Sequence, residues 1–410
     1  MSLMGNTKSS GLHVTGRLVL TGTLALALVV GMAPMSQAQV DGGLANSAIL
    51  DATPASVLPT AVAAATPTPK QALAKLTLDQ RVGQVLMMGV PATGASKSDL
   101  ATLTKYKVGN VFLKGRSSSG VKSTKAIVAK INATVGSSST GGQKRFVATD
   151  QEGGNVQVLK GAGFSAMPTA LRQGTWSTTA LRSNATTWAK QLKAAGINVN
   201  LAPVADTVPG AAFAPYNSPI GYWHREFGYT SGHVANDVAA FAQGMRAGGV
   251  APVAKHFPGL GRVTRNTDTS SNVKDTTTTR TSAYIKPFAK AIAGGTRWVM
   301  VSNAYYTKID AGHVGPFSST IMKSMLRKDL GFTGIVISDD MCTAKQLSPW
   351  SYATRAKNFF NAGGTMMLCV NAAAVPSIHK ALVAEAKASP AFRAKIDAAA
   401  LEVSETRAGK

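Results

Sequence analysis

Two acidic residues, Asp339 and Asp340, stand directly after the β-branched run 335–337, separated from it only by Ser338. A further acid, Asp268, follows a second apolar run, 249–253, at a distance of fifteen residues. Cleavage of a glycosidic bond needs one carboxylate beneath the anomeric carbon and one proton donor beside the leaving oxygen. Carboxyl groups at the ends of apolar runs therefore favour chemistry of the glycosidase kind.

Asp339 is the candidate for the carboxylate that attacks the sugar, because the end of a buried strand can hold its side chain in one orientation. Asp340 points the opposite way if the alternation of the strand continues, which suits a hydrogen-bonding role. The alternative is that both residues only cap the following loop.

A second group of polar residues is suited to holding a sugar. Asp150 and Glu152 flank Gln151 and precede two glycines, which allow close approach of the backbone to a ligand. Lys255 and His256 follow the run 249–253 and can bind hydroxyl groups. The plainer alternatives are a turn for the first pair and a structural role for the second.

Eight short apolar runs alternate with helical patterns, and this alternation predicts the elements that would position these residues. Short β-branched runs are typical of strands buried on both faces. The predicted strands are 82–90, 108–113, 145–149, 197–204, 250–254, 298–302, 335–338 and 365–370. The clearest predicted helices are 121–134, 179–195, 233–247, 318–330 and 352–362. Glycines expected to end helices in a left-handed conformation are Gly196, Gly248, Gly294, Gly331 and Gly363.

This order of elements predicts an α/β fold, a (β/α)8 TIM barrel forming a single catalytic domain. An open doubly wound sheet is the alternative, but no GxGxxG motif follows the first strand. In a barrel, catalytic groups lie at the carboxyl ends of the strands. The polar residues that follow predicted strands are Asp150, Asp206, Lys255, His256, Asn303 and Asp339.

The amino-terminal region has the features of an export signal. Residues 1–38 contain basic residues, an apolar run of about 16 residues and a small-x-small cleavage site, which together predict a cleaved signal peptide. A transmembrane anchor is the alternative, but a spanning helix needs about 20 apolar residues. Residues 39–69, rich in Ala, Thr and Pro, predict a disordered tether, and 70–410 the barrel domain. We therefore expect a secreted or cell-wall-associated protein.

The chain has 410 residues, a formal net charge of +24 and a pI near 10.2. This charge is consistent with a solvated basic surface or with attraction to anionic cell-envelope polymers. No nucleic-acid-binding motif is present, and we expect no nucleic acid partner, no metal, no cofactor and a monomeric state. The two cysteines, Cys342 and Cys369, are expected to be small core residues, although export would also allow a disulfide.

Five segments together resemble motifs of glycoside hydrolase family 3, in the order of that family. They are Lys255-His256-Phe257-Pro258-Gly259, Asp150-Gln151-Glu152-Gly153-Gly154, the segment 202–206, Arg225-Glu226-Phe227-Gly228 and the segment 331–340. The similarity covers roughly residues 73 to 390 and is greatest to the single-domain β-N-acetylhexosaminidase branch of the NagZ type. The resemblance implies a retaining double displacement with Asp339 as nucleophile. It also implies that Asp150, Arg225, Lys255 and His256 hold the terminal sugar.

The sequence departs from that branch at the position of the proton donor. The resemblance implies an Asp-x-His pair on the loop after strand five, but the corresponding residues are Asn266, Thr267 and Asp268, and no His occurs from 257 to 312. Asp268 is therefore the candidate for proton transfer, which requires apolar enclosure or a nearby anion to raise its pKa. The alternative is that Asp268 lies on a polar loop without a catalytic role.

The resemblance and the intact carboxylates predict a secreted β-N-acetylhexosaminidase that acts on amino-sugar glycans such as those of the cell wall. Two alternatives stay open. One is a β-glucosidase of the same family, and the other is a catalytically weak barrel that binds carbohydrate or cell wall. The natural glycan and its aglycone are not specified by the sequence.

Overall fold

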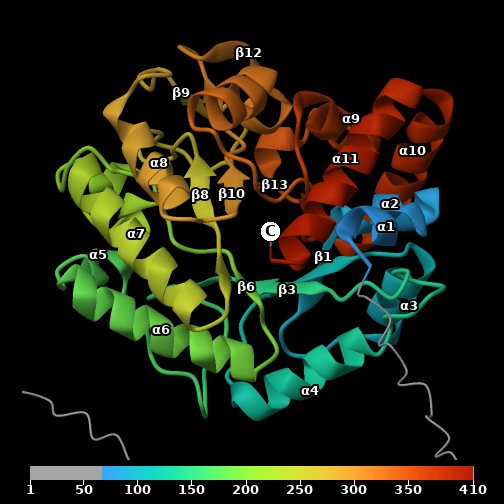
Figure 1. Ribbon diagram of the computed structural model, residues 1–410. Helices are drawn as coiled ribbons and strands as arrows, with labels where there is room; N and C mark the ends of the chain where they lie inside the picture. Colours follow the sequence, from blue (N-terminus) through green and yellow to red (C-terminus); the bar gives the residue numbers. More distant parts are fainter. Residues whose placement is uncertain (1–66, 410) are drawn as a thin grey trace, which may run out of the picture. The chain divides into compact units, whose positions relative to one another are not determined.

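The computed structural model describes residues 67–409, and this part of the chain lies within one compact unit, residues 64–410. Parallel strands occupy its centre, and helices surround them (Figure 1). The predicted signal peptide and nearly all of the predicted tether lie outside the described residues. No helix among residues 67–409 is long and apolar enough to cross a bilayer.

The parallel strands form two sheets with a TIM-barrel-like arrangement. The first sheet has the order β14–β1–β2–β3–β6–β7, and the second has the order β13–β10–β8. The strands are β1 (Leu86–Pro91), β2 (Asn110–Lys114), β3 (Phe146–Thr149), β6 (Val199–Asn200), β7 (Ala251–Pro252), β8 (Ala254–Phe257), β10 (Trp298–Val301), β13 (Ile335–Ser338) and β14 (Met367–Cys369). Isolated parallel bridges, Val204 with Lys255 and Ile337 with Met366, connect the sheets at two places.

Side-chain alternation along the strands separates two apolar clusters. Successive residues of a strand point to opposite faces, so residues i and i+2 share a face. The smaller cluster takes such pairs from both sheets, for example Trp298 with Met300 and Ile335 with Ile337. The residues between them, such as Val299 and Val336, belong to the larger cluster that the helices cover. Strands buried on both faces are the reason why the sequence shows continuous apolar runs.

The helices begin at well-formed caps. Thr77, Ser177, Thr230 and Ser351 each accept a backbone N–H bond at the start of a helix, which satisfies a donor that the helix cannot pair itself. The helices are α1 (Pro69–Ala74), α2 (Leu78–Gln84), α3 (Lys97–Lys105), α4 (Gly120–Asn132), α5 (Ala170–Gln173), α6 (Thr178–Ala194), α7 (Ser231–Ala247), α8 (Lys286–Ala293), α9 (Tyr352–Ala362), α10 (Val375–Ala388), α11 (Pro390–Arg407) and the π-helix η5 (Thr320–Asp329). The five predicted helices are confirmed within a few residues.

Several boundaries differ from the predictions. Residues 82–84 of the predicted strand 82–90 form the last turn of α2, a helix that starts at the capping box of Thr77 and Gln80, and β1 begins at Leu86. Gly248 and Gly294 were predicted to take the left-handed conformation, but Gly249 and Gly295 take it instead, at φ +82° and +89°. Gly196, Gly331 and Gly363 take the left-handed conformation as predicted, at φ +87°, +60° and +109°.

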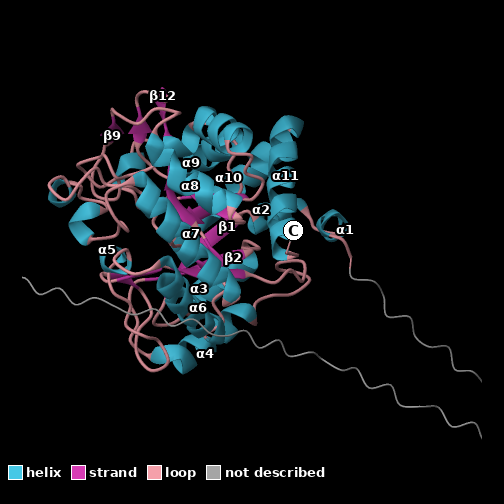
Figure 2. Ribbon diagram, turned by 60° about the vertical axis from the view of Figure 1, so that its left-hand side comes forward, coloured by secondary structure: helices cyan, strands magenta, loops and turns pink. Residues whose placement is uncertain are grey.

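Additional short strands lie beyond the carboxyl ends of the parallel strands. β9 (Lys274–Asp275), β11 (Tyr305–Tyr306) and β12 (Asp310–Val314) form a small sheet, with β9 and β12 on either side of β11. β9 and β12 lie close together in both views (Figures 1 and 2). β4 (Gln151–Gly153) and β5 (Val156–Gln157) form a hairpin after β3. The hairpin β4–β5 holds the segment after Asp150, and the pairing of β9 with β11 holds the segment after Asp268.

Candidate functional site

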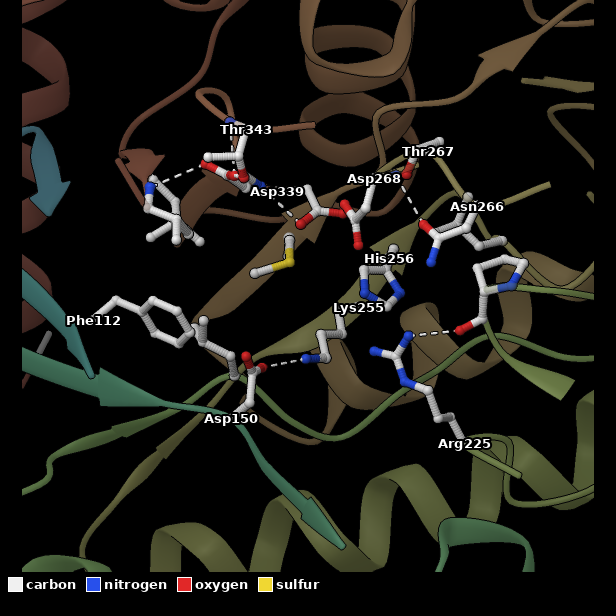
Figure 3. A pocket seen from close by; sticks show the side chains of 17 residues that line it. Phe112, Asp150, Arg225, Lys255, His256, Asn266, Thr267, Asp268, Asp339 and Thr343 are labelled. Carbon is white, nitrogen blue, oxygen red and sulfur yellow. Dashed lines mark hydrogen bonds and ion pairs between the residues drawn. The ribbon is translucent and has the colours of Figure 1, made fainter. Parts of the chain in front are cut away.

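A pocket of about 230 Å³ collects most of the polar residues predicted to act together (Figure 3). Its floor is apolar and contains Phe112, Leu201, Met300 and Leu368, which belong to the smaller apolar cluster. The predicted site residues that line it are Asp150, Arg225, Lys255, His256, Asp268 and Asp339. All six therefore face one cavity, although they come from segments separated by up to 189 residues in the chain.

Four alternating charges form one side of the pocket, the charged wall: Asp150, Arg225 and Lys255 line it, and the buried Glu152 pairs with two of them without reaching the lining. Lys255 Nζ lies 2.6 Å from Asp150 Oδ1 and 2.6 Å from Glu152 Oε1. Arg225 donates to both carboxylate oxygens of Glu152, with Nε–Oε2 at 2.9 Å and Nη2–Oε1 at 2.8 Å. A two-point Arg–carboxylate contact fixes both orientation and distance. The wall therefore presents side chains that are held in place before any ligand arrives.

The charges in this wall stabilise one another against the cost of burial. Burial alone would raise the pKa of Glu152, but Arg225 and Lys255 outweigh it and lower this pKa to about 2. Burial would likewise lower the pKa of Lys255, yet Asp150 and Glu152 raise it above its ordinary value. The lysine and the glutamate therefore both stay charged near neutral pH, and the glutamate holds Lys255 and Arg225 in place at the pocket.

His256 is oriented by a fully buried carboxylate. Asp206 Oδ2 lies 2.7 Å from His256 Nδ1, and Asp206 Oδ1 accepts hydrogen bonds from the backbone N–H groups of His256 and Leu260. The contact occupies Nδ1 and leaves Nε2 as the ring nitrogen available to the pocket. Asp206, noted in the sequence only for its place after a strand, thus acts on the site through His256.

Asp339 and Asp340 have different surroundings, as the alternation of the strand predicts. The Asp340 carboxylate accepts backbone N–H bonds from Cys342, Thr343 and Val370, and it also contacts the Thr343 hydroxyl. Among the residues that the structure describes, Asp339 Oδ1 accepts only the N–H of Asp340, at 2.8 Å. The structural role predicted for Asp340 is confirmed, and the Asp339 carboxylate keeps most of its hydrogen-bonding capacity for the pocket.

Asp268 lies on the same side of the pocket as Asp339, and the two carboxyl groups point toward each other (Figure 3). Asp268 is an exposed residue of its loop, yet its carboxyl group lies in the pocket, where surrounding protein displaces part of its water. This enclosure is the main cause that raises the pKa of Asp268 to about 6, and the negative charge of Asp339 is the second. One carboxyl group near neutral pH can therefore be protonated beside another that is ionised.

The loop that carries Asp268 is held against the segment after Asp339. The backbone N–H groups of Lys345 and Gln346 donate to the carbonyl oxygens of Asp268 and Thr267, each at 3.0 Å. The buried Gln346 side chain also pairs with Val273, accepting from its N–H at 2.9 Å and donating to its oxygen at 3.2 Å. These bonds fix the position of Asp268 relative to Asp339 in the described structure.

The two cysteines are buried core residues, as predicted, and they form a disulfide, the alternative that the sequence left open. Cys342 follows Asp340 by two residues, and Cys369 ends β14, with Cα atoms 5.1 Å apart. Folding brings the two strand ends side by side, a proximity that one pair of cysteines in a sequence does not reveal. The disulfide connects the turn after Asp339 to the neighbouring strand.

Comparison with known proteins identifies the family. Residues 77–405 match the family model described as "Glycosyl hydrolase family 3 N terminal domain". The chain belongs to glycoside hydrolase family 3. Members of this family hydrolyse O-glycosyl bonds, so the protein is a glycoside hydrolase.

Individual family 3 relatives agree with this assignment. A crystal structure of a β-N-acetylhexosaminidase from Beutenbergia cavernae is 48% identical, with a TM-score of 0.81, and the match covers 81% of this chain and 99% of that one. A β-hexosaminidase from Nitrosomonas eutropha is 29% identical over 295 residues, which cover 70% of this chain and 80% of the relative. A Paenibacillus β-N-acetylglucosaminidase is 24% identical with a TM-score of 0.71, covering 81% of this chain and 63% of that one, and supports the fold alone.

Sequence reasoning missed several parts of this family 3 site. The apolar floor was not predicted, although Phe112, Met300 and Leu368 lie near the ends of predicted strands. Glu152 was grouped with Asp150 as a sugar-binding acid, but it is buried and paired with two cations instead. Gln346 carried no signal, because its role depends on a contact across 73 residues of sequence. Asn303, also at a strand end, does not line the pocket; its side chain donates to the carbonyl oxygen of Asp340.

Proposed function

We propose that the protein is a retaining β-N-acetylhexosaminidase that removes terminal β-linked N-acetylglucosamine from glycans. The observation that carries this proposal is the pair formed by Asp339 and Asp268. One carboxyl group is free to attack, the other has a raised pKa, and both face one pocket. The close relative from Beutenbergia cavernae, a β-N-acetylhexosaminidase, supports the choice of substrate.

In the proposed mechanism, the charged wall binds the hydroxyl groups of the terminal sugar. An oxygen of Asp339 attacks the anomeric carbon while the protonated Asp268 gives its proton to the leaving oxygen, so that the aglycone departs as an alcohol. The products of this step are a glycosyl ester on Asp339 and an ionised Asp268. A water molecule then loses a proton to Asp268 and attacks the anomeric carbon, which releases the sugar with its original configuration.

The change of charge during the reaction suits Asp268 for both roles. The negative charge of Asp339 helps to keep the proton on Asp268 in the free enzyme. Formation of the ester removes that charge, so the pKa of Asp268 falls when it must become a base. The same side chain can thus serve as acid in the first step and as base in the second.

We further propose that the eight runs close into one (β/α)8 barrel that forms a single catalytic domain. The mixed apolar cluster and the two bridges between the sheets support closure. Residues 1–38 would direct export of the enzyme and then be cleaved, with residues 39–69 as a tether. The basic charge would then favour cell-wall glycans as substrates and anionic envelope polymers as neighbours.

The central test is covalent trapping with a slow fluorosugar that retains the N-acetyl group. We expect the label on Asp339, located by mass spectrometry of a digest, and a β-configured first product by NMR. A label on another residue would contradict the assignment of the nucleophile. Rates on matched aryl β-glucoside and β-N-acetylglucosaminide substrates distinguish a glucosidase, and glycan binding without turnover would favour a binding barrel.

A further inference from the structure

The large hydrophobic side chains that are exposed among residues 67–409 all lie on one loop. They are Tyr216, Tyr222 and Trp223, with 70%, 58% and 43% of their surfaces exposed. Tyr222 and Trp223 form an edge-to-face pair with ring centroids 4.9 Å apart. Clustered apolar surface on a soluble domain commonly marks a place where a ligand or partner binds.

This aromatic loop adjoins the pocket. Pro219 and Arg225, which line the pocket, stand on either side of Tyr222 and Trp223 in the chain. Successive Cα atoms are about 3.8 Å apart, so the Cα atom of Trp223 lies within about 8 Å of that of Arg225. The Pro219 carbonyl oxygen accepts a hydrogen bond from Arg225 Nη1 at 2.7 Å, which ties the loop to the charged wall (Figure 3).

The loop is also held to the segment that leads to Asp268. The fully buried Asn217 side chain donates to the carbonyl oxygens of Leu260 and Val263, at 2.8 and 2.7 Å, and accepts the N–H of Gly221 at 2.7 Å. Asp268 follows Val263 by five residues. A proton donor must lie beside the leaving group. Because the aromatic loop is bonded to the segment that precedes the proposed donor Asp268, we expect this loop to lie on the aglycone side of the pocket.

The size of the pocket leaves the rest of a glycan outside it. A volume of about 230 Å³ is below the roughly 300–1,000 Å³ of sites that enclose drug-sized ligands. It suits a single sugar ring, and the following rings of a longer substrate must lie at the rim. Aromatic rings there offer flat apolar surface to the C–H faces of pyranose rings, with little loss of conformational freedom because Asn217 already fixes the loop.

We propose that Tyr216, Tyr222 and Trp223 form a binding platform for the aglycone, and that this aglycone is itself a carbohydrate chain of at least one further pyranose ring. This inference rests on the proposed function, since it assigns the leaving-group side of the same site. It defines the substrate as an oligosaccharide whose terminal sugar enters the pocket while the next rings lie on the aromatic loop.

The test compares wild type with Tyr222→Ala, Trp223→Ala and the double variant on β-1,4-linked N-acetylglucosamine oligomers of two to five units. We expect kcat/KM on the oligomers to fall by about 3- to 10-fold per ring removed, the size of one lost aromatic contact. Inhibition by free N-acetylglucosamine, which fills only the pocket, should stay unchanged. Trp223→Phe should retain most of the oligomer activity.

His224→Asn is the matched control, because His224 is exposed on the same loop and Asn tolerates its positive φ of 54°. It should leave oligomer kinetics unchanged, and melting temperatures verify that each variant folds. Unchanged kinetics on every oligomer, or binding of wild type to lipid vesicles that the same substitutions abolish without any kinetic effect, would overturn the platform. A wild type inactive on every β-N-acetylglucosaminide would contradict the proposed function instead.

Discussion

The two sides of the pocket differ in how their charged side chains are paired. On one side Asp150, Lys255, Glu152 and Arg225 alternate in sign, and each is paired with at least one neighbour. On the other side Asp268 and Asp339 face each other, with no ion pair to either among the described residues. The paired side lowers the pKa of a carboxyl group to about 2, and the unpaired side raises one to about 6.

This difference shows how one cavity can both bind and react. Charges that satisfy one another resist changes of protonation, so the paired side offers fixed donors and acceptors to a sugar. A carboxylate without a cation retains its nucleophilicity, and its neighbour is easier to protonate. The apolar floor between the two sides limits the water that would otherwise weaken both effects.

The largest effect should come from the unpaired side. Asp339→Ala removes the proposed nucleophile, and we expect kcat/KM on an aryl β-N-acetylglucosaminide to fall by about 10⁴-fold or more. Steady-state hydrolysis measures the loss. Asp329→Asn, at an exposed acid on η5, should leave the rate near that of wild type. Near-normal turnover by Asp339→Ala would show that Asp339 is not the nucleophile and that the chemistry does not take place on the unpaired side of the pocket.

Asp268→Ala should lower activity by about 10²- to 10⁴-fold on substrates with poor leaving groups, the range typical of general acid–base catalysis. Activated aryl substrates need less protonation and should lose less. In wild type, kcat/KM should fall as the pH rises above about 6, because Asp268 must be protonated to act as the acid. A pH–rate series measures this fall, and its persistence in Asp268→Ala would exclude Asp268 as its cause.

The same raised pKa has a consequence for stability. The folded protein holds the Asp268 proton up to about pH 6, whereas the ordinary pKa is 3.8, so the native state binds more protons between these values. The free energy of unfolding should therefore decrease from pH 4 to pH 6 through this group. Asp268→Asn should lack that decrease, which would appear as a difference in melting temperature from wild type that changes with pH over this range.

On the paired side, Lys255→Met leaves Asp150 without a cation and Glu152 with Arg225 alone. Breaking a buried pair by removing one partner costs about 3–5 kcal/mol, and we expect a loss of that order in chemical denaturation. Glu152 contributes stability above its ordinary pKa of 4.5, and this is lost as the pH falls toward about 2. The variant should therefore lose part of its stability advantage at pH 7 over pH 3.

The control is Lys357→Met, which removes a pair with Glu385 whose side chains are 40% and 35% exposed. Exposed pairs contribute about 0–1 kcal/mol, so this variant should differ little from wild type. Equal losses in the two lysine variants would show that the charged wall is no more than a surface ion pair. Lys255→Met should also raise KM, while the Lys357 variant should not.

A site residue could be predicted from the sequence when its role follows from its place at the end of a strand. Asp339, Lys255 and Asp150 directly follow predicted strands, so the rule that barrel sites lie at strand ends was sufficient to group them. Asp340 was separated from Asp339 by alternation alone. The helix and strand order was likewise readable, because each element has its own apolar period.

Residues that act through a distant contact could not be predicted. The pairing of Glu152 with Arg225 spans 73 residues, and the Cys342–Cys369 bond depends on two strand ends meeting. The boundary between α2 and β1 was not predicted correctly, because the same short apolar sequence fits both the buried face of a helix and a buried strand. Gln346 belongs to this group, since nothing near it in sequence indicates that it holds the loop of Asp268.

Gln346 offers the smallest and most selective test of the unpaired side. Gln346→Leu removes both side-chain bonds to Val273 but leaves the two catalytic carboxyl groups in the chain. We expect the leucine to cost about 1–3 kcal/mol, because a buried N–H loses its acceptor. Since Asp268 would then be less well placed, kcat on poor leaving groups should fall about tenfold, and much less on activated aryl substrates.

Gln84→Leu separates positioning from stability. Gln84 is a buried glutamine at the carboxyl end of α2, and its side chain donates to the Thr140 carbonyl oxygen at 3.2 Å, away from the pocket lining. Its loss should lower stability by a similar amount without a selective effect on poor leaving groups. If the two variants lose activity in the same proportion on every substrate, Gln346 acts only through stability. A leaving-group dependence confined to Gln346→Leu would show that Gln346 positions Asp268 for catalysis. The reactive side would then depend on a residue outside the pocket, whereas the residues of the paired side hold one another in place.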